Sequence, residues 1–374
     1  FKLFELGSIH KKINEDKYVE QNQLVIAWNV NDLRDWKQNS NFDIYTIKGE
    51  LNHFFASFGL DADYSYNEEV ISININKTTI GTFVDSHVLN SKILRKWIRR
   101  FGMRDVPEFS SQSLKKLQKL EKIPTWNEKA DGFNAKKSEQ KRVILIQDAF
   151  TSFYESGLII EFYHLLKKLG LHVFLAPFHE NGKPLHVKGF LNQFQKVAEK
   201  QASWLEKIAS SGIPLVGIEP SVVLTYRDEY PEILMNDDLN FNVMLPQEFL
   251  LEQLHLLQSH RPRESETFSL LGHCMEKTGA SASQTQWLEI FQALGQELNL
   301  IEVGCCGMAG TYGHETEHFE ESKGIYKMSW QKHCRGDSNL GNQLLVSGFS
   351  CRSQIERFEN FRPLHPIQAL NQMI

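Results

Sequence analysis

The sequence is short of cysteine, of long apolar runs and of any excess of one charge. Five cysteines in 374 residues, an odd number, are too few for a disulfide-stapled fold. No run of about eighteen apolar residues occurs, so we expect no transmembrane helix. The formal charge of −5 gives no electrostatic reason to expect a nucleic acid or an anionic membrane as the main partner.

The first residues of the sequence do not predict a signal peptide. The chain begins with Phe1 instead of Met, and the residues that follow lack the charged and apolar regions of a signal peptide. This start fits a fragment of a longer protein, or an assembled or truncated reading frame. We expect a cytoplasmic location and leave peripheral attachment to a membrane open.

Two zones of different composition precede the main part of the chain. Residues 1–95 contain strand-like runs at 24–28, 70–75 and 79–83 and a helical stripe at 47–58, which together predict a small α+β unit. Residues 96–142 are basic, with nine Lys or Arg against four acidic residues between Leu114 and Arg142. This stretch is either a docking segment for an acidic partner or, as we favour, a solvated linker.

From residue 143 onward, short apolar runs alternate with amphipathic helices, and the pattern occurs twice. Residues 143–260 have strands at 143–146, 173–175 and 214–217, and residues 261–374 have strands at 268–271, 300–303 and 344–347. Helices are expected at 155–169, 187–209, 284–294 and 315–330. The alternation predicts an α/β fold with doubly wound parallel sheets. Corresponding positions are offset by 126, 129 and 131 residues, which predicts duplicated halves; the pairs are Asp148 with Cys274, Ala176 with Cys305, and Gly217 with Gly348.

Four of the five cysteines follow strands of the second half. Cys274 follows the first of these strands, Cys305 and Cys306 follow the second, and Cys351 follows the third. Ligands bind at the carboxyl ends of parallel strands, so we expect the thiols to converge there. Thiolates suit an iron–sulfur cluster or zinc, and the adjacent glycines let backbone N–H groups approach. The opposing interpretation, buried cysteines without a metal, is weaker for four thiols together.

A second metal motif overlaps this region. Residues 314–318 read His-Glu-Thr-Glu-His, which matches H-E-x-x-H and would present two histidines to zinc if it lay on a helix. A zinc hydrolase is a remote interpretation, because no third ligand follows at a familiar spacing. His273 and His314 are expected to lie beside the thiols and support them. Cys334 is expected to be incidental. Arg227 and Arg352 either contact an anionic substrate or partner or, as we favour, form a local salt bridge or helix cap.

Residues 304–315, which read GCCGMAGTYGHE, resemble the cysteine-rich CCG domain. This domain occurs in the C subunit of glycerol-3-phosphate dehydrogenase, in the B subunit of heterodisulfide reductase and in FAD-linked 2-hydroxyacid oxidases. The segments 147–154, 226–230, 272–274 and 350–354 are similar to the C-terminal part of large bacterial FAD and 4Fe-4S oxidases of the D-2-hydroxyglutarate or D-lactate dehydrogenase type. This resemblance covers about residues 98–374. It implies a cluster or metal on Cys274, Cys305, Cys306 and Cys351, with electrons passing from a flavin to an acceptor.

The chain departs from that family in two respects. Residues 348–351 read Gly-Phe-Ser-Cys where the family has C-x-x-C, which leaves zinc open as the metal. The flavin domain and the ferredoxin-type cysteine run of such oxidases have no counterpart in this sequence. The resemblance therefore implies FAD on another region or on a flavoprotein partner, and a small 2-hydroxy acid only as an indirect substrate.

Residues 1–94 resemble a different family. The runs 3–7, 42–49 and 73–81 are similar to the catalytic-like module of the phenylalanyl-tRNA synthetase β subunit, which is a structural piece in its own family. Two hypotheses follow for the whole chain. The first is an oxidoreductase module, inactive alone, that relays electrons through an iron–sulfur centre from a flavin-dependent 2-hydroxyacid dehydrogenase. The second is a zinc-bound structural module that docks a synthetase-like partner; because Zn²⁺ has no redox chemistry, iron content distinguishes the two.

Overall fold

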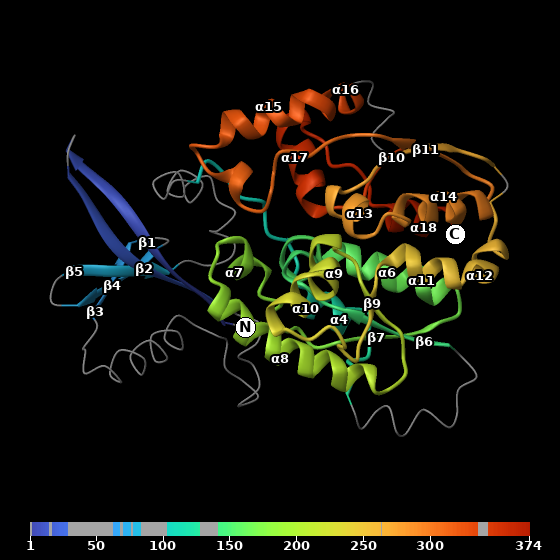
Figure 1. Cartoon of the computed structure of the whole chain (residues 1–374), viewed down its shortest axis with the longest axis horizontal. Helices are drawn as coiled ribbons and strands as arrows, with labels where there is room; N and C mark the ends of the chain where they lie inside the picture. Colours follow the sequence, from blue (N-terminus) through green and yellow to red (C-terminus); the bar gives the residue numbers. More distant parts are fainter. Residues whose placement is uncertain are drawn as a thin grey trace. The chain divides into compact units, whose positions relative to one another are not determined.

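Figure 1 shows the computed structural model of the chain. It describes residues 2–14, 17–28, 63–67, 70–75, 78–83, 103–127, 141–262, 264–335 and 343–374. The chain divides into two compact units, Phe1–Phe109 and Ser110–Ile374, which we describe separately.

The first unit contains two antiparallel sheets among its described residues. Strand β1 (Lys2–Asn14) pairs with β2 (Lys17–Trp28). Strands β3 (Asp63–Asn67), β4 (Val70–Ile75) and β5 (Thr78–Phe83) form the second sheet in that order. The strands predicted at 24–28, 70–75 and 79–83 are confirmed. The helix predicted at 47–58 lies outside the described residues.

The second unit begins within the basic stretch. Helix α4 (Leu114–Leu120) starts at the cap residue Ser113, whose hydroxyl accepts a hydrogen bond from the N–H of Lys116 at 3.3 Å. Leu114 is buried, and so are Ile123 and Trp126 after the helix. Residues 114–126 of this stretch are therefore packed against the domain, whereas residues 96–102 and 128–140 lie outside the described part, so the linker stays a prediction there.

The first parallel sheet has the strand order β7-β6-β8-β9. Alternate residues of β6 point to opposite faces, and both faces are covered: Val143 and Leu145 share a core with α6, whereas Ile144 and Ile146 share another with α8. The strands are β6 (Arg142–Ile146), β7 (His172–Leu175), β8 (Leu215–Gly217) and β9 (Val243–Met244). The helices are α6 (Ser156–Lys168), which follows a π-helical turn (Phe150–Tyr154), then α7 (Lys183–Val187), α8 (Leu191–Ala209), α9 (Pro220–Arg227), α10 (Glu229–Leu234), α11 (Pro246–Glu252) and α12 (Leu254–Gln258).

The second parallel sheet has the order β11-β10-β12. Its strands are β10 (Thr267–Leu271), β11 (Glu297–Ile301) and β12 (Leu344–Val346). Its helices are α13 (Cys274–Gly279), α14 (Ser283–Ala293), α15 (Phe319–Ser329), α16 (Gln331–Cys334), α17 (Phe349–Glu359) and α18 (Pro366–Met373), with a 3-10 turn at Tyr312–His314. Both sheets place their first strand between the second and third. The α/β class with parallel sheets is confirmed, whereas the origin of the halves by duplication stays a prediction.

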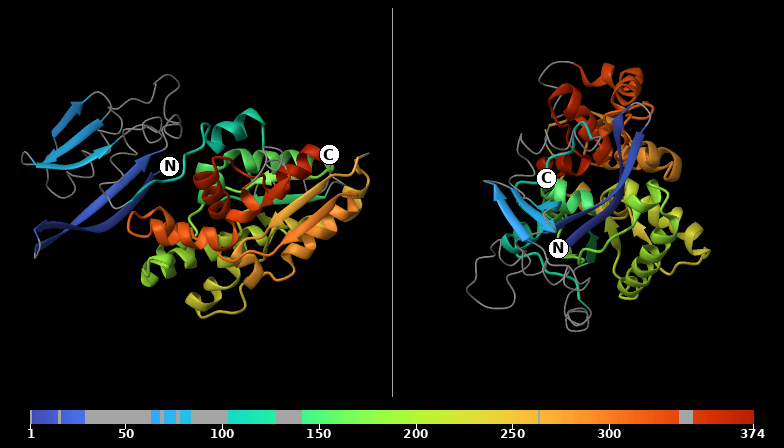
Figure 2. Two further views of the ribbon diagram at one scale, coloured as in Figure 1. Left: turned by 90° about the horizontal axis from the view of Figure 1, so that it is seen from above. Right: turned by 90° about the vertical axis from the view of Figure 1, so that its left-hand side faces the viewer.

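The two sheets share one hydrophobic core. Helices α6, α11, α14 and α18 lie between them (Figures 1 and 2), and this core takes in Leu145 of β6 and Leu270 of β10 together. Polar contacts also cross between the halves, because the Nε2 group of Gln368 donates to Glu161 at 2.9 Å. The carboxyl ends of both sets of strands consequently belong to one folded body.

Three predicted boundaries were wrong. The helix expected at 187–209 begins at Leu191, because α7 ends at Val187 and a short turn separates the two helices. Strand β11 spans 297–301 instead of 300–303, because it is an edge strand in which Leu298 is buried while Leu300 is exposed. Helix α15 begins at Phe319 instead of residue 315, because the chain first forms the 3-10 turn at 312–314. A run of apolar residues in the sequence identifies neither the limits of an edge strand nor the start of a helix that follows a turn.

Candidate metal centre

Three elements carry the four thiols predicted to form the site. Cys274 is the first residue of α13, behind β10, and Cys351 lies in the first turn of α17, behind β12. Cys305 and Cys306 lie in the loop after β11. Cys305 is exposed, Cys274 is half-buried, and Cys306 and Cys351 are buried. Each thiol thus follows the carboxyl end of its strand.

The thiols form a row of neighbours in the order Cys274, Cys305, Cys306 and Cys351. The thiols of Cys274 and Cys306 donate hydrogen bonds to the sulfur of Cys305, as does the N–H of Gly307 at 3.3 Å. These bonds outweigh burial and lower the pKa of Cys305 to about 2, whereas they combine with burial to raise the pKa of Cys274 and Cys306. Metals bind cysteine in its thiolate form. Cys305 is therefore already in the form that binds a metal, whereas Cys274 and Cys306 release their protons when a metal binds.

The spacing of the row differs from that of a closed zinc site. Zinc holds four thiolate sulfurs at about 2.3 Å, which places the sulfurs roughly 3.8 Å from one another. Among the described residues, only Glu315, Glu317 and His318 bring three ligand atoms within 4.8 Å of one another. The sulfurs of the row therefore do not close into the tight tetrahedron of a zinc site.

A glycine turn holds Cys305 and Cys306 in place. Gly307 has φ +84°, a left-handed conformation that favours glycine. A Cβ atom at this position would lie 2.3 Å from the carbonyl oxygen of Ser322, so no larger residue fits without movement of the backbone. The same turn directs the N–H of Gly307 at the sulfur of Cys305.

A buried carboxylate fixes the segment around Cys274. Glu276 accepts the N–H of His273 at 3.2 Å and the hydroxyl of Ser283 at 2.7 Å, and it also bonds the hydroxyl of Ser347 at the end of β12. It thereby ties the start of α13 to the neighbouring strand and to α14. Sequence reasoning missed this residue, although its place three positions after the helix cap His273 is that of a capping box.

The imidazole of His273 lies between two parts of the site. Its Nδ1 accepts the N–H of Met275 at 3.3 Å, and burial lowers the pKa of the ring, which favours a neutral form with its proton on Nε2. The ring packs on Gly348, where an added Cβ would lie 2.2 Å from its Cδ2 atom. Gly348, which precedes α17, thus makes room for the ring of His273.

Helix α17 connects the two buried thiols. It carries Cys351, and its Gln354 donates through Nε2 to the carbonyl of Cys306 at 2.9 Å and to the hydroxyl of Ser322 at 2.8 Å. All four residues are buried. A displacement of α17 therefore moves Cys351 directly and Cys306 through Gln354.

The H-E-x-x-H segment does not form the helix that its zinc-binding pattern requires. His314 ends the 3-10 turn, and His318 precedes α15. Glu315 is paired with Lys188 at 2.9 Å and accepts the hydroxyl of Thr311 at 3.0 Å. The two histidines therefore do not share a helical face, which removes the basis of the zinc-hydrolase interpretation.

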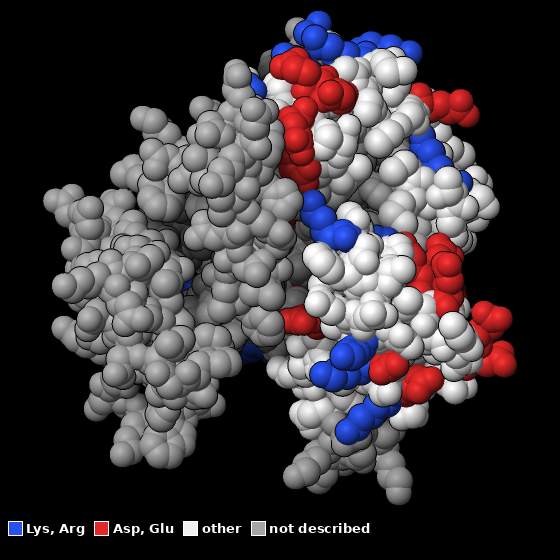
Figure 3. Space-filling model, turned by 60° about the vertical axis from the view of Figure 1, so that its left-hand side comes forward, with Lys and Arg blue, Asp and Glu red and all other residues white. Residues whose placement is uncertain are grey.

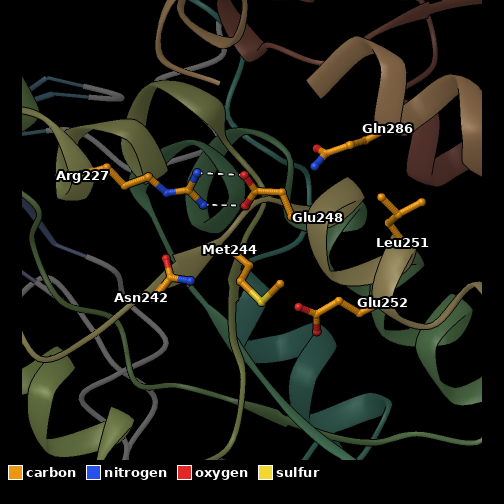
Figure 4. A pocket seen from close by; sticks show the side chains of 7 residues that line it. All are labelled: Arg227, Asn242, Met244, Glu248, Leu251, Glu252 and Gln286. Carbon is orange, nitrogen blue, oxygen red and sulfur yellow. Dashed lines mark hydrogen bonds and ion pairs between the residues drawn. The ribbon is translucent and has the colours of Figure 1, made fainter. Parts of the chain in front are cut away.

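Both arginines form salt bridges, but that of Arg352 is not local, because its partner Glu155 lies 197 positions away in the first half. Arg227 binds Glu248 with two hydrogen bonds and donates to the carbonyl of Val243 at 2.7 Å. This pair lies in a pocket of about 590 Å³, which Gln286 of α14 also lines (Figure 4). Because its guanidinium already has a carboxylate partner, Arg227 is not available to an anionic substrate. Arg352 is buried and paired with Glu155.

The first half has carboxyl groups where the second half has thiols. Asp148 follows β6 and accepts hydrogen bonds from the N–H groups of Phe150 at 2.7 Å and Thr151 at 3.0 Å. Glu219 follows β8 and accepts the hydroxyl of Ser221 at 2.9 Å. Burial raises the pKa of Asp148 and of Glu219 to about 7 each.

The surface gives no single electrostatic signal. Acidic and basic side chains are interspersed over the described residues of the face in Figure 3. No helix among the described residues is both long and apolar enough to cross a membrane.

Known proteins resemble this chain over most of its length. It is 42% identical over 294 residues, 77% of the chain, to a D-2-hydroxyglutarate dehydrogenase of Pantoea ananatis, of which 28% is covered. It is 40% identical over 289 residues to the Escherichia coli protein of the same name, covering 76% of this chain and 28% of the relative. The chain is homologous to part of these dehydrogenases. It spans about 28% of their length.

Two further similarities concern other proteins. The chain is 29% identical over 200 residues to the C subunit of the anaerobic glycerol-3-phosphate dehydrogenase of Escherichia coli, covering 52% of this chain and 49% of that relative. Residues 1–89 match the family model described as the phenylalanyl tRNA synthetase beta chain CLM domain. The chain thus resembles oxidoreductases over most of its length and a synthetase module at its N-terminus.

Proposed function

We propose that about residues 98–374 are the cysteine-rich CCG region of an oxidoreductase of the D-2-hydroxyglutarate dehydrogenase type. In this proposal Cys274, Cys305, Cys306 and Cys351 hold an iron–sulfur cluster, 4Fe-4S by the family resemblance. The observation that carries the proposal is the row of four thiols behind three neighbouring strands, with Cys305 already favoured as a thiolate. The homology to dehydrogenases supports the same class of chemistry.

The donor set fits an iron–sulfur cluster better than a single zinc ion. A cluster places several iron and sulfide ions between its thiolate ligands and therefore spaces them more widely than one ion does. The spacing of the thiols agrees, since no three of the four sulfurs lie within 4.8 Å of one another. When bound, the cluster would accept and pass on single electrons. The chain's own residues would hold it, and the N–H of Gly307 would stabilise the charge on Cys305.

The remaining parts of the reaction lie outside these residues. The relatives are named for D-2-hydroxyglutarate, so we propose that this 2-hydroxy acid is oxidised at a flavin, FAD by the family resemblance. The flavin would belong to another region or to a flavoprotein partner. The exposed Cys305 would provide a route for electrons between that flavin and the cluster, whereas Cys306 and Cys351 are buried.

Iron and acid-labile sulfide analysis of the anaerobically purified chain, with its visible spectrum, tests the proposal. We expect both elements and a charge-transfer absorption that dithionite bleaches. Cys305→Ser should abolish metal binding, because Cys305 is the central thiolate of the row. Cys334→Ala removes a buried cysteine outside the row and should keep the metal. Zinc alone, or unchanged metal content in Cys305→Ser, would refute the assignment.

A further inference from the structure

The half without cysteines contacts the helix that carries Cys351. The side chain of Glu219, behind β8 of the first half, accepts the N–H of Phe349 at 2.9 Å. Phe349 is the first residue of α17 in the second half. This N–H is one of the groups at the start of a helix that have no partner within the helix, and a carboxylate there is also favoured by the helix dipole.

A second carboxylate of the first half contacts the same helix turn. Glu155, which caps α6, binds the guanidinium of Arg352 with two hydrogen bonds and that of Arg362 with two more. Arg352 is 1% exposed and also donates to the carbonyls of Val346 at 2.8 Å and Ser347 at 2.7 Å. Burial alone would raise the pKa of Glu155, but the two guanidinium groups lower it to about 2. Glu155 and Arg352 are therefore both charged and both buried away from water at neutral pH.

The two contacts flank a thiol of the proposed site. Phe349 precedes Cys351 by two residues, and Arg352 follows it directly. One turn further along α17, Gln354 holds the carbonyl of Cys306. Both buried thiols therefore take their position from a helix that the first half holds at two points.

We infer that Glu219 and Glu155 are positioning residues for the thiol site, so that the site is incomplete without the half that has no cysteines. The identity of the group bound at the thiols rests on the proposed function, whereas the contacts of Glu219 and Glu155 with α17 do not. The strand ends of the first half would then serve the thiol site of the second half instead of holding a group of their own.

Alkylation of the metal-free chain tests this without any bound metal. Iodoacetamide reacts with a buried thiol only when the surrounding structure opens, and peptide mass spectrometry reports the rate at each cysteine. Glu219→Gln and Glu155→Gln should each raise the rate at Cys351, relative to that at exposed Cys305, by about tenfold, because each weakens a charge-assisted contact. Glu248→Gln disrupts a comparable carboxylate–guanidinium pair inside the first half and should leave the ratio within twofold of that in the unaltered chain.

The outcomes separate the two proposals. Equal ratios in Glu219→Gln, Glu155→Gln and the unaltered chain would overturn the positioning role, as would an equal increase in Glu248→Gln. If circular dichroism shows that Glu155→Gln does not fold, the test rests on Glu219→Gln. Glu219→Ala should raise the alkylation rate at Cys351 further than Glu219→Gln does, because the amide of Gln still accepts the N–H of Phe349. Absence of iron in the unaltered chain would refute the proposed function and leave the alkylation result standing. If iron is present, its reduction potential should shift in Glu219→Gln and not in Glu248→Gln.

Discussion

Two buried carboxyl groups of the first half, those of Glu155 and Asp148, have opposite electrostatic environments. Glu155 has two guanidinium partners and a pKa lowered to about 2, whereas burial, together with the nearby charge of Glu219, raises the pKa of Asp148 to about 7. Glu155 therefore stabilises the fold above pH 4.5, its ordinary pKa, and this contribution is lost as the pH falls toward 2. Asp148 acts in the opposite direction, because its folded state binds the proton more tightly than the unfolded state does.

The stability of the metal-free chain should therefore depend on Asp148 between about pH 4 and 7. The contribution of its proton is complete below pH 3.8 and is lost as the pH rises through about 7. The loss amounts to at most about 1.4 kcal/mol per pH unit for one group. Asp148→Asn keeps an oxygen for the N–H groups of Phe150 and Thr151, so it should unfold in urea with a smaller loss of stability from pH 5 to pH 8.

The exposed carboxylate Asp237 provides the control for this measurement. Asp237→Asn should leave the pH dependence of the unaltered chain unchanged. Identical slopes in Asp148→Asn and the unaltered chain would show that Asp148 does not carry the dependence.

At the same scale, residue types predicted the thiols but not the groups that hold them. Clustered cysteine, glycine and histidine residues indicate a metal site in a sequence. Glu276, Gln354 and Ser322 are common polar residues whose role depends on contacts across 32 to 71 positions of sequence, such as Gln354 with Ser322 and Glu276 with Ser347. A one-dimensional pattern cannot contain such pairs.

At the scale of elements, alternating apolar runs predicted most of the described strands of the second unit, but only four of its described helices, α6, α8, α14 and α15. One prediction failed at the edge strand β11, where apolar residues are not all buried. Another failed before α15, where a glycine-rich loop stands in place of the predicted start of the helix. The turn that carries Cys305 and Cys306 is such a segment, and its shape depends on Gly307 more than on any side chain.

Alanine substitution at two glycines should distinguish the backbone requirement for glycine at Gly307 from the ordinary preference of a helix for alanine over glycine. Gly307→Ala places a Cβ atom 2.3 Å from the carbonyl of Ser322 at φ +84° and should cost about 1–3 kcal/mol of stability, with loss of metal binding. Gly324→Ala lies in α15 with open space around its Cβ and should stabilise the chain by about 0.5–1 kcal/mol. Urea unfolding and metal content measure both effects; a neutral Gly307→Ala would contradict the close approach.

At the scale of the whole second unit, the sequence suggested two separate halves, and the structure joins them through one core. Periodicity indicates which face of a helix is apolar but not which neighbour covers it. The apolar face of α6 illustrates this, since its residues share a core with Leu145 of the first sheet and Leu270 of the second. The helices between the sheets thus bury apolar surface for both halves at once, and the positioning contacts of Glu155 and Glu219 cross the same boundary.

One core implies that the halves unfold together. Leu165 of α6 is completely buried in it, so Leu165→Ala should cost about 2–5 kcal/mol. Hydrogen exchange under native conditions should then show less protection in β6 of the first sheet and equally in β10 of the second. Leu120→Ala, at a residue that is 63% exposed, should change neither. Reduced protection confined to β6 would mean that the halves fold independently, and the contacts of the first half with α17 would then be too weak to fix the position of Cys351.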